Sequence, residues 1–586
     1  MASFDLRARS PFSSRLRTTF IPNDVDTCLA KSIIRQESLR IAELEKEITR
    51  VKGLYDGLKM QYSQISDFIR DHRRMIHPVR RGLPDDILQE IFLHCVSTGR
   101  FIALHSSVPP LSLTAVCTSW RRVARSTPRL WASLHIPIFD QVNWRLDSPT
   151  WGFLSAEQAQ AQLKCRASVV QQWLTLAKRK PLNLALPAPD WIQTRRTLNF
   201  PEELCLLLDV FKSSASSLKR LDIQITKNRL DGLGKIGSLK FCLLDDLHAS
   251  LMNSAFEADS TKLRSLPLFS APHLKKLRVS NFPFEVVSSL PVIWNQLTHL
   301  RLEKTQGPFD AWEVDCLLRK CPQLVHCSIL PSRYQQRPSG HTPIHQDQVV
   351  VLHHLKYFDI DIPHPHEPAT AAFAMLQLPA LEDIGVFWAG LIHSPLLSLV
   401  EGCNIRTLNT AGTLFRGEEL IQCLRLCPNL SVLLLGDKDS SSFATNFESD
   451  TDIDRTDAFL RMLSFPDDNG QVLCPCLEIF QISATHTEYT DQAVLAFIKA
   501  KQEGKRGISN LKSLAISFWR VQKLPMAKEL SPYREQGLKL VLRYMAPSRL
   551  AASKTLGKSL ATVSMPKSYH RYRRAKLDSE RMQDIF

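Results

Sequence analysis

The chain has 586 residues and a mass of 66.6 kDa, with 44% hydrophobic and 23% charged residues, a composition that excludes a mainly disordered, collagen-like or membrane-embedded protein. The net charge is +16, but residues 1–82 hold 16 Lys/Arg against 10 Asp/Glu and residues 531–586 hold 12 against 4. Because the body of the chain is close to neutral, composition gives little support to nucleic-acid binding. The 14 cysteines are too sparse for a disulfide scaffold and predict a reducing compartment, cytoplasmic or nuclear.

Residues 24–78 predict one long helix, preceded by a disordered basic tail at residues 1–23. With Ile34 at position a of a heptad, every a and d position from Ile41 to Ile69 is apolar or tyrosine. We call these a and d residues the seam. A seam sustained over four heptads is typical of a coiled coil or a long packed helix. Two alternatives stay open: pairing with a second copy or a partner helix, and folding back onto the same chain.

Residues 79–135 predict three short helices with apolar faces. Pro84 suits a helix start, and Asp85 and Asp86 complement the positive end of the helix. The apolar stripe of this first helix comprises Ile87, Leu88, Ile91 and Phe92. A second helix is predicted from Leu113 to Ala124, with a stripe of Leu113, Val116, Cys117, Trp120 and Val123. So small a unit buries little surface and leaves apolar side chains exposed, as is typical of a helix-packing docking module.

This stretch resembles an F-box. The matching elements, in order, are Leu83-Pro84, Ile87-Leu88, Ile91-Phe92, Val116-Cys117, Trp120-Arg121 and Pro128-x-Leu130-Trp131. With a heptad helix before it, the chain looks like the expanded F-box family of mushroom-forming (basidiomycete) fungi. The alternative is a plain three-helix linker with an internal core.

The resemblance implies docking on the Skp-type adaptor of a cullin–RING ubiquitin ligase. Carried over by position, the residues that would meet the adaptor are Leu83, Pro84, Ile87, Leu88, Ile91 and Phe92. Those that would divide between this contact and the box's own core are Leu113, Val116, Cys117 and Trp120.

Residues 136–540 predict an irregular leucine-rich-repeat solenoid. The pattern Leu-x-x-Leu-x-Leu, with substitutions, recurs eleven times, and several successive starts lie 23 to 27 residues apart. The starts are Leu218, Leu239, Leu274, Leu297, Leu324, Leu355, Leu381, Ile405, Leu430, Leu477 and Leu511. A degenerate opening unit contains Leu182, Leu184 and Leu186. Helical stretches, each with a proline just past its end, separate the hits. We therefore expect parallel strands to line a concave, protein-binding face and helices to line the convex one.

The sequence predicts no catalytic motif, no cofactor site and no metal site. Cys474-Pro475-Cys476 and the pairs Cys423/Cys427 and Cys316/Cys321 lack paired zinc spacing and are predicted to be small buried hydrophobes. Six histidines between His341 and His366 are interpreted as loop residues. Residues 541–586 predict a basic tail, in which residues 567–576 could instead serve as a nuclear signal or a weak nucleic-acid contact.

The predicted fold class is multidomain, α then α/β: a long helix or coiled coil, a three-helix F-box and an irregular solenoid. The expected function is that of a non-catalytic substrate receptor in a Skp-adaptor–cullin–RING ubiquitin ligase, with a protein target of unknown identity. Its expected partners are the adaptor, the cullin and, through the coiled coil, a second copy. The alternatives are a non-ligase interaction scaffold built from the same modules, and nucleic-acid binding through the basic ends.

Overall fold

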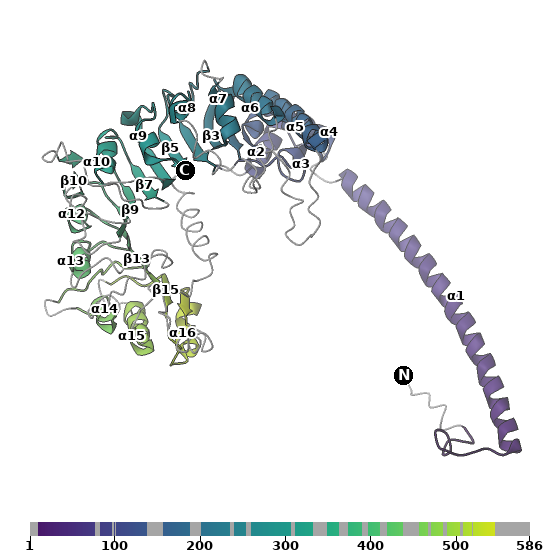
Figure 1. Ribbon diagram of the computed structural model, residues 1–586. Coiled ribbons are helices and arrows are strands. Elements are labelled where there is room, and N and C mark those ends of the chain that lie inside the picture. Colours follow the sequence, from purple (N-terminus) through teal and green to yellow (C-terminus); the bar gives the residue numbers. More distant parts are fainter. Residues whose placement is uncertain are drawn as a thin grey trace. The chain divides into compact units, whose positions relative to one another are not determined.

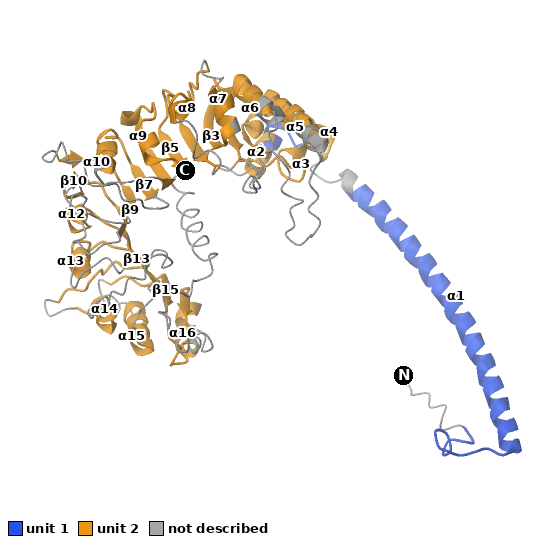
Figure 2. Cartoon of the chain, viewed as in Figure 1, with its two compact units in different colours: residues 1–88 blue, residues 89–586 orange. Residues whose placement is uncertain are grey.

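The chain forms a long N-terminal helix followed by a large parallel sheet with helices along one side (Figure 1). The computed structural model describes residues 10–76, 83–96, 99, 101–136, 156–187, 201–234, 239–252, 260–305, 311–331, 349–362, 373–388, 396–410, 419–436, 456–466, 470–483, 489–503, 508–518 and 520–544. The chain divides into two compact units, residues 1–88 and residues 89–586 (Figure 2). This confirms the α then α/β organisation.

The first unit consists mainly of helix α1, Asp24–Ile76, which confirms the predicted long helix. The helix follows Asn23, whose side-chain oxygen accepts a hydrogen bond of 2.8 Å from the amide of Asp26. Asp24 and Asp26 lie in the first turn, where negative charge complements the helix dipole. The seam residues are exposed, and what they pair with stays a prediction.

The second unit contains a parallel sheet whose fourteen strands follow chain order. Its first seven strands are β1 Ser133–His135, β2 Leu182–Leu186, β3 Leu218–Ile225, β4 Asp246–Leu251, β5 Lys276–Ser280, β6 His299–Thr305 and β7 His326–Pro331. The others are β9 Tyr357–Ile362, β11 Asp383–Trp388, β12 Thr407–Thr410, β13 Val432–Gly436, β14 Ile479–Ser483, β15 Ser513–Ser517 and β16 Lys539–Arg543. A two-stranded parallel ladder joins β8 Val350–Val351 to β10 Leu376–Gln377. This solenoid-like sheet agrees with the repeat prediction.

Helices occupy most of the connections between strands, as a parallel sheet requires (Figure 1). In the first half these are α5 Ala156–Ala177, α6 Pro201–Ser214, α7 Lys227–Leu233, α8 Ser260–Arg264, α9 Phe284–Ser288, η7 Trp294–Gln296 and α10 Ala311–Arg319. In the second half they are α12 Leu396–Val400, α13 Glu419–Arg425, α14 Asp457–Met462, α15 Asp491–Gln502 and α16 Met526–Glu535. None of the described helices is both long enough and apolar enough to cross a membrane.

The repeat motif explains the core. Its apolar positions lie in register across neighbouring strands, so that Leu277, Leu300, Cys327 and Phe358 align and are all buried. Each large aliphatic or aromatic side chain buried in this way contributes roughly 1.5–3 kcal/mol. The residues between them alternate to the opposite face of the sheet, away from the described helices (Figure 1).

One predicted repeat has the wrong register. The sequence pattern placed its motif at Leu239, Cys242 and Leu244, but Cys242 is exposed. The pairing of β3 with β4 aligns Leu221 with Leu247 and Ile223 with Ala249, so the motif begins five residues later. Ala249 fills a position where a larger aliphatic residue is usual, which hides the pattern in the sequence.

The sheet also crosses the boundaries expected at both of its ends. Strand β1 lies inside the range 79–135 that was assigned to the short helices, and β16 continues to Arg543, past residue 540. The predicted basic segment at residues 567–576 and the rest of the C-terminal tail from residue 545 lie outside the described residues. So do residues 1–9 of the N-terminal tail.

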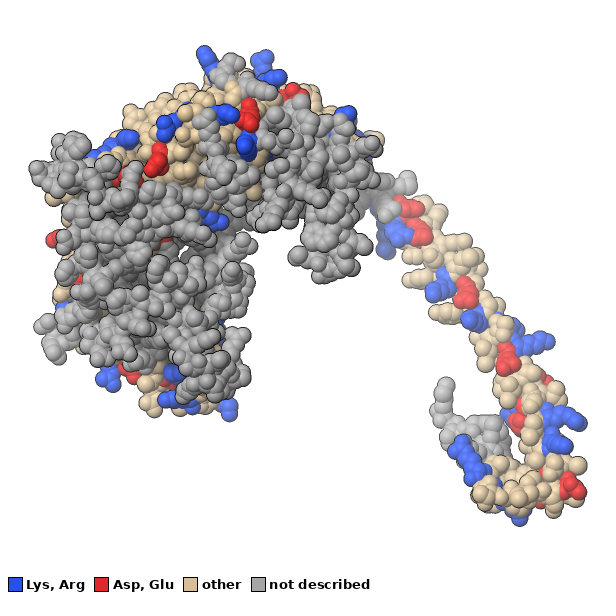
Figure 3. All heavy atoms as spheres, viewed as in Figure 1, with Lys and Arg blue, Asp and Glu red and all other residues tan. Residues whose placement is uncertain are grey.

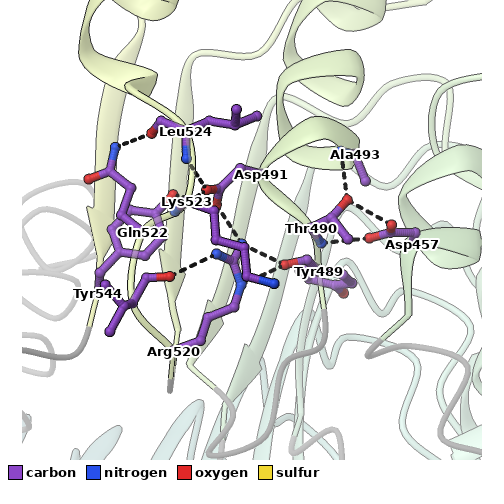
Figure 4. A network of polar contacts seen from close by, with 11 residues as sticks. Asp457, Tyr489, Thr490, Asp491, Ala493, Arg520, Gln522, Lys523, Leu524 and Tyr544 are labelled. Atoms are coloured by element: carbon purple, nitrogen blue, oxygen red, sulfur yellow. Dashed lines mark hydrogen bonds and ion pairs between the residues drawn. The ribbon is translucent and has the colours of Figure 1, made fainter. Parts of the chain in front are cut away.

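A polar network centred on Asp491 joins the last repeats (Figure 4). Its carboxylate accepts hydrogen bonds from Arg520 at 2.5 Å, from the amides of Lys523 and Leu524 at 2.8 Å each, and from the Tyr544 hydroxyl at 3.0 Å. Burial alone would raise the pKa of Asp491, but the donors, led by Arg520, lower that pKa to about 2. The ionised carboxylate therefore ties α15 to the chain on both sides of α16.

Candidate functional site

The predicted docking residues lie in a short-helix region, residues 83–136. Its helices are α2 Asp85–Cys95, α3 Leu111–Thr114, α4 Thr118–Ser126 and the 3-10 turn η2 Pro128–Trp131. Helix α2 follows Pro84, whose carbonyl accepts a 3.0 Å hydrogen bond from the amide of Leu88. Its first turn contains Asp85 and Asp86, as the sequence predicts.

The second predicted helix is broken in two, which corrects the expected continuous stripe from Leu113 to Val123. Cys117 has an extended backbone, with φ −158° and ψ 172°, and caps α4 by accepting a hydrogen bond from the amide of Trp120. Arg121 bridges the break by donating to the carbonyl oxygen of Thr114 at 2.8 Å. Val116 consequently lies in the link between α3 and α4 rather than on a helix face.

The buried side of the region is aromatic. Phe92 is fully buried, and its ring centroid lies 4.9 Å from that of Trp120. This contact packs α2 against α4. Farther along, the Trp131 indole donates a 2.8 Å hydrogen bond to the carbonyl oxygen of Ala124, which fixes η2 against the end of α4.

The opposite side exposes aliphatic side chains. Ile87 and Ile91 lie one turn apart on α2 and are 46% and 40% exposed, and Val116 is 58% exposed. Residues at i and i+4 share one helix face. Helix α2 therefore has two apolar faces, of which one packs on its own chain and the other faces solvent.

The ten predicted docking residues thus fall into three groups. The exposed ones are Pro84, Ile87, Ile91 and Val116. The half-buried ones are Leu83, Cys117 and Trp120. The buried ones are Leu88, Phe92 and Leu113. The resemblance assigned Leu88 and Phe92 to the adaptor contact, but both side chains are buried in the interior of this conformation.

The short-helix region continues directly into the sheet, which the sequence analysis missed. Strand β1 follows η2 and pairs with β2, with Leu134 opposite Leu184. The Trp131 and Trp173 rings meet edge to face with centroids 4.8 Å apart, and the Trp173 indole donates to the carbonyl oxygen of Trp131 at 2.8 Å. Leu134 and Ile136 are buried and alternate with the half-buried Ser133 and His135, and this apolar–polar alternation is the sequence signal that could have identified the strand.

A second candidate surface is the sheet face opposite the helices. His299, His326 and Tyr357 lie in register on β6, β7 and β9. Ring centroids are 5.8 Å apart between the two histidines and 4.1 Å apart between His326 and Tyr357, in stacked geometry. Burial, with help from Lys276, lowers the pKa of His299 to about 4. Burial, with the neighbouring His299, lowers that of His326 to about 3. Both rings are therefore neutral at pH 7.

Charged residues lie beside this aromatic row. Glu303 contacts Arg301 at 2.5 Å and Arg278 at 3.2 Å. Burial alone would raise the pKa of Glu303, but Arg301 and Arg278 lower that pKa to about 2, so the carboxylate is ionised at pH 7. The middle of this face is consequently an arrangement of stacked rings and paired charges.

The cysteine motifs occupy the interior of the repeats. Cys321, Cys423, Cys427 and Cys474 are buried, and Cys316 and Cys476 are half-buried. Burial raises the pKa of the Cys321 and Cys474 thiols to about 12. No group of three or more metal-binding side chains occurs among the described residues. Of the histidines between His341 and His366, only His353 and His354 belong to the described part of the chain.

The comparisons with known proteins assign no family. No protein-family model and no curated protein match the sequence. Among solved structures, the chain is similar to a crystal structure of a Bacteroides fragilis protein from a structural genomics programme, with 12% sequence identity. That similarity covers 51% of this chain and 74% of the other, with a TM-score of 0.26.

Proposed function

We propose that this chain is the substrate-recognition subunit of a Skp-adaptor–cullin–RING ubiquitin ligase and acts in the cytoplasm or nucleus. The observation that carries the proposal is the second apolar face of α2. Ile87 and Ile91 remain exposed although Leu88 and Phe92 already fill the core. An isolated surface helix normally turns polar residues to solvent, so an exposed aliphatic pair supports a binding partner.

In this proposal the chain contributes position rather than catalysis. The pairing of β1 with β2 and the contact between Trp131 and Trp173 join the adaptor-binding end to the repeat sheet. A target held on the sheet face would keep its lysines near the ubiquitin carrier, which raises their effective concentration. The stacked row of His299, His326 and Tyr357 is the proposed centre of target binding.

The experiment is co-purification of the full chain with a Skp-type adaptor. We expect the wild type to retain the adaptor and Ile91→Asp to lose it, because a buried, unpaired carboxylate opposes docking. Ile293→Asp is the matched control, since Ile293 is also aliphatic and 41% exposed but lies in the repeats. Trp120→Ala is a poorer probe because Trp120 packs on Phe92 and its loss would disturb the core. Equal retention by Ile91→Asp and wild type would refute the docking surface.

The competing function is a scaffold that uses the same surfaces without a ligase. Ubiquitin transfer to a bound target, in a reaction reconstituted with cullin, RING protein and carrier enzyme, separates the two. Retention of the adaptor without any ubiquitin transfer would favour the scaffold.

A further inference from the structure

The seam of α1 is exposed among the described residues of the first unit. Its nine apolar or tyrosine residues from Ile41 to Ile69 are between 44% and 75% exposed. At 1.5 Å per residue, the 53-residue helix is about 80 Å long. Monomeric soluble proteins rarely leave so long an apolar stripe in water, and most helices in proteins are stabilised by packing of such a face.

We propose that the seam pairs with that of a second copy of this chain, as a parallel, in-register, two-stranded coiled coil. The first argument is residue type. Ile41 and Ile48 occupy successive a positions, and Leu44 and Leu58 occupy d positions. β-Branched residues at a with leucine at d favour two parallel strands.

The second argument is charge complementarity at the edges of the seam. In a parallel dimer, each g residue faces the e residue of the partner's next heptad. Arg40 at g then faces the partner's Glu45, and Glu47 at g faces the partner's Lys52. By symmetry each pair occurs twice, so four pairs of opposite charge would flank the seam. Side chains of both signs lie along α1 (Figure 3).

The same charged residues also form contacts within the helix. Arg40 lies 3.9 Å from Glu37, and Glu47 lies 2.6 Å from Arg50. Exposed ion pairs of either kind contribute little to stability. The seam, once buried in the dimer, therefore provides most of the affinity. The charged residues at e and g determine which helix α1 pairs with, and in which orientation and register.

The third argument is the position of the two glycines. Gly53 falls at f and Gly57 at c, both on the outer side of the heptad, and a side chain at either would meet no atom of the described residues. The helix-weakening residues thus leave the seam itself uninterrupted.

The first experiment measures the mass of the full chain in solution by light scattering. We expect about twice 66.6 kDa for the wild type, and a monomer for the double variant Leu44→Asp/Leu58→Asp. The matched control is Leu39→Asp/Met60→Asp, which places the same two charges at exposed f positions and should stay dimeric. A monomeric or trimeric wild type, or a dimer that survives the seam variant, would overturn the proposal.

The second experiment tests the orientation. Ile41→Cys places two thiols in facing a positions of a parallel, in-register dimer, so mild oxidation should cross-link it. Lys46→Cys, at an outer f position, should remain at the wild-type background. An antiparallel pair centred on residue 50, the midpoint of α1, would separate the two copies of position 41 by about 27 Å, and a failure of Ile41→Cys to cross-link would contradict the proposal.

The third experiment tests partner choice. Glu47→Lys turns two attractive pairs into repulsive ones and should raise the dimer dissociation constant about tenfold. Adding Lys52→Glu should restore the affinity. Both variants lack the contact between Glu47 and Arg50, so the recovery reports the pairs between helices alone. Glu43→Lys, at an outer c position, is the control. These readouts use no adaptor, so they fail or succeed independently of the proposed function.

Discussion

The indole Nε1–H of Trp173 donates a 2.8 Å hydrogen bond to the main-chain carbonyl oxygen of Trp131, and the two rings meet edge to face. Trp131 belongs to the short-helix region and Trp173 to α5, the first helix beside the sheet. The contact therefore fixes the region that carries Ile91 to the start of the repeats. The pairing of β1 with β2 is a second connection between the same two parts.

Substitution of Trp173 should separate the hydrogen bond from the packing. Trp173→Phe keeps a buried ring but removes the donor and leaves the Trp131 carbonyl unpaired, so we expect a loss of about 1 kcal/mol in unfolding free energy. Trp173→Ala also leaves a cavity and should cost about 3–5 kcal/mol. Urea unfolding with hydrogen exchange at β1 measures both. If Trp173→Ala were as stable as Trp173→Phe, the result would contradict the role of the Trp173 ring in packing.

The Asp491 network should make stability depend on pH. The folded pKa of about 2 lies below the ordinary aspartate pKa of 3.8. The contribution of the carboxylate is therefore complete above about pH 4 and is lost as the pH falls toward 2. With a side chain only 1% exposed, the shift corresponds to roughly 2 kcal/mol. Unfolding measured between pH 7 and pH 2.5 should show this decline.

A matched pair of variants isolates that network. Asp491→Asn replaces an accepting carboxylate oxygen by an amide NH₂ group, which cannot accept hydrogen bonds from Arg520, Lys523 or Leu524. We expect the unfolding free energy to fall by about 2–3 kcal/mol at pH 7. Asp231→Asn removes an exposed carboxylate that pairs with Lys262 at 2.7 Å, and should cost less than about 1 kcal/mol. Equal losses would argue against a special role for Asp491.

Protonation of the stacked histidines should also lower the unfolding free energy as the pH falls. Their folded pKa values, about 4 for His299 and about 3 for His326, lie below the ordinary histidine pKa of 6.5. Below about pH 6.5 the unfolded chain therefore binds more protons than the folded chain. The contribution of the two neutral rings to stability is complete above that pH and is lost as the pH falls toward 4 and then 3. Histidine proton resonances followed by NMR should show both rings unprotonated at pH 5. His326→Phe should flatten the decline while keeping the stack on Tyr357.

Adding a methyl group to a glycine should have opposite effects at two sites. A Cβ at Gly53 in α1 meets open space, so Gly53→Ala should stabilise the helix by about 1 kcal/mol. A Cβ at Gly385 in β11 would lie 2.6 Å from Oδ1 of Asp359, so Gly385→Ala should destabilise the sheet by about 1–3 kcal/mol. Thermal unfolding by circular dichroism measures both. Combining Gly385→Ala with Asp359→Ala should recover part of the loss, and strictly additive losses would exclude the clash.

Local periodicity explains what could be predicted. The heptads of α1 and the repeat motifs each depend on residues a few positions apart, and a seven-residue or Leu-x-x-Leu-x-Leu pattern is visible without any long-range information. The exception, β4, shows the limit of this reasoning. Ala249 is small enough to be ambiguous, and only its pairing with Ile223 shows that it occupies a core position.

The features that escaped prediction depend on distant contacts. The break at Cys117 accompanies packing of Trp120 on Phe92, 28 positions earlier. The Asp491 network connects groups 29 to 53 residues apart, with no local signature. The apolar stripe of α2 contains all of Ile87, Leu88, Ile91 and Phe92. The sequence of this stripe does not show which of these side chains the rest of the chain will bury, so the burial of Leu88 and Phe92 could not be predicted.

Strand order has a last consequence. Every described strand of the large sheet pairs only with the strands before and after it in that sheet, so each repeat is stabilised by its nearest neighbours. Damage near β15 and β16 would therefore fray the far repeats while β1 and β2 stay folded. The length and sequence of the distal repeats could therefore change without disturbing the end of the sheet at which Trp131 contacts Trp173.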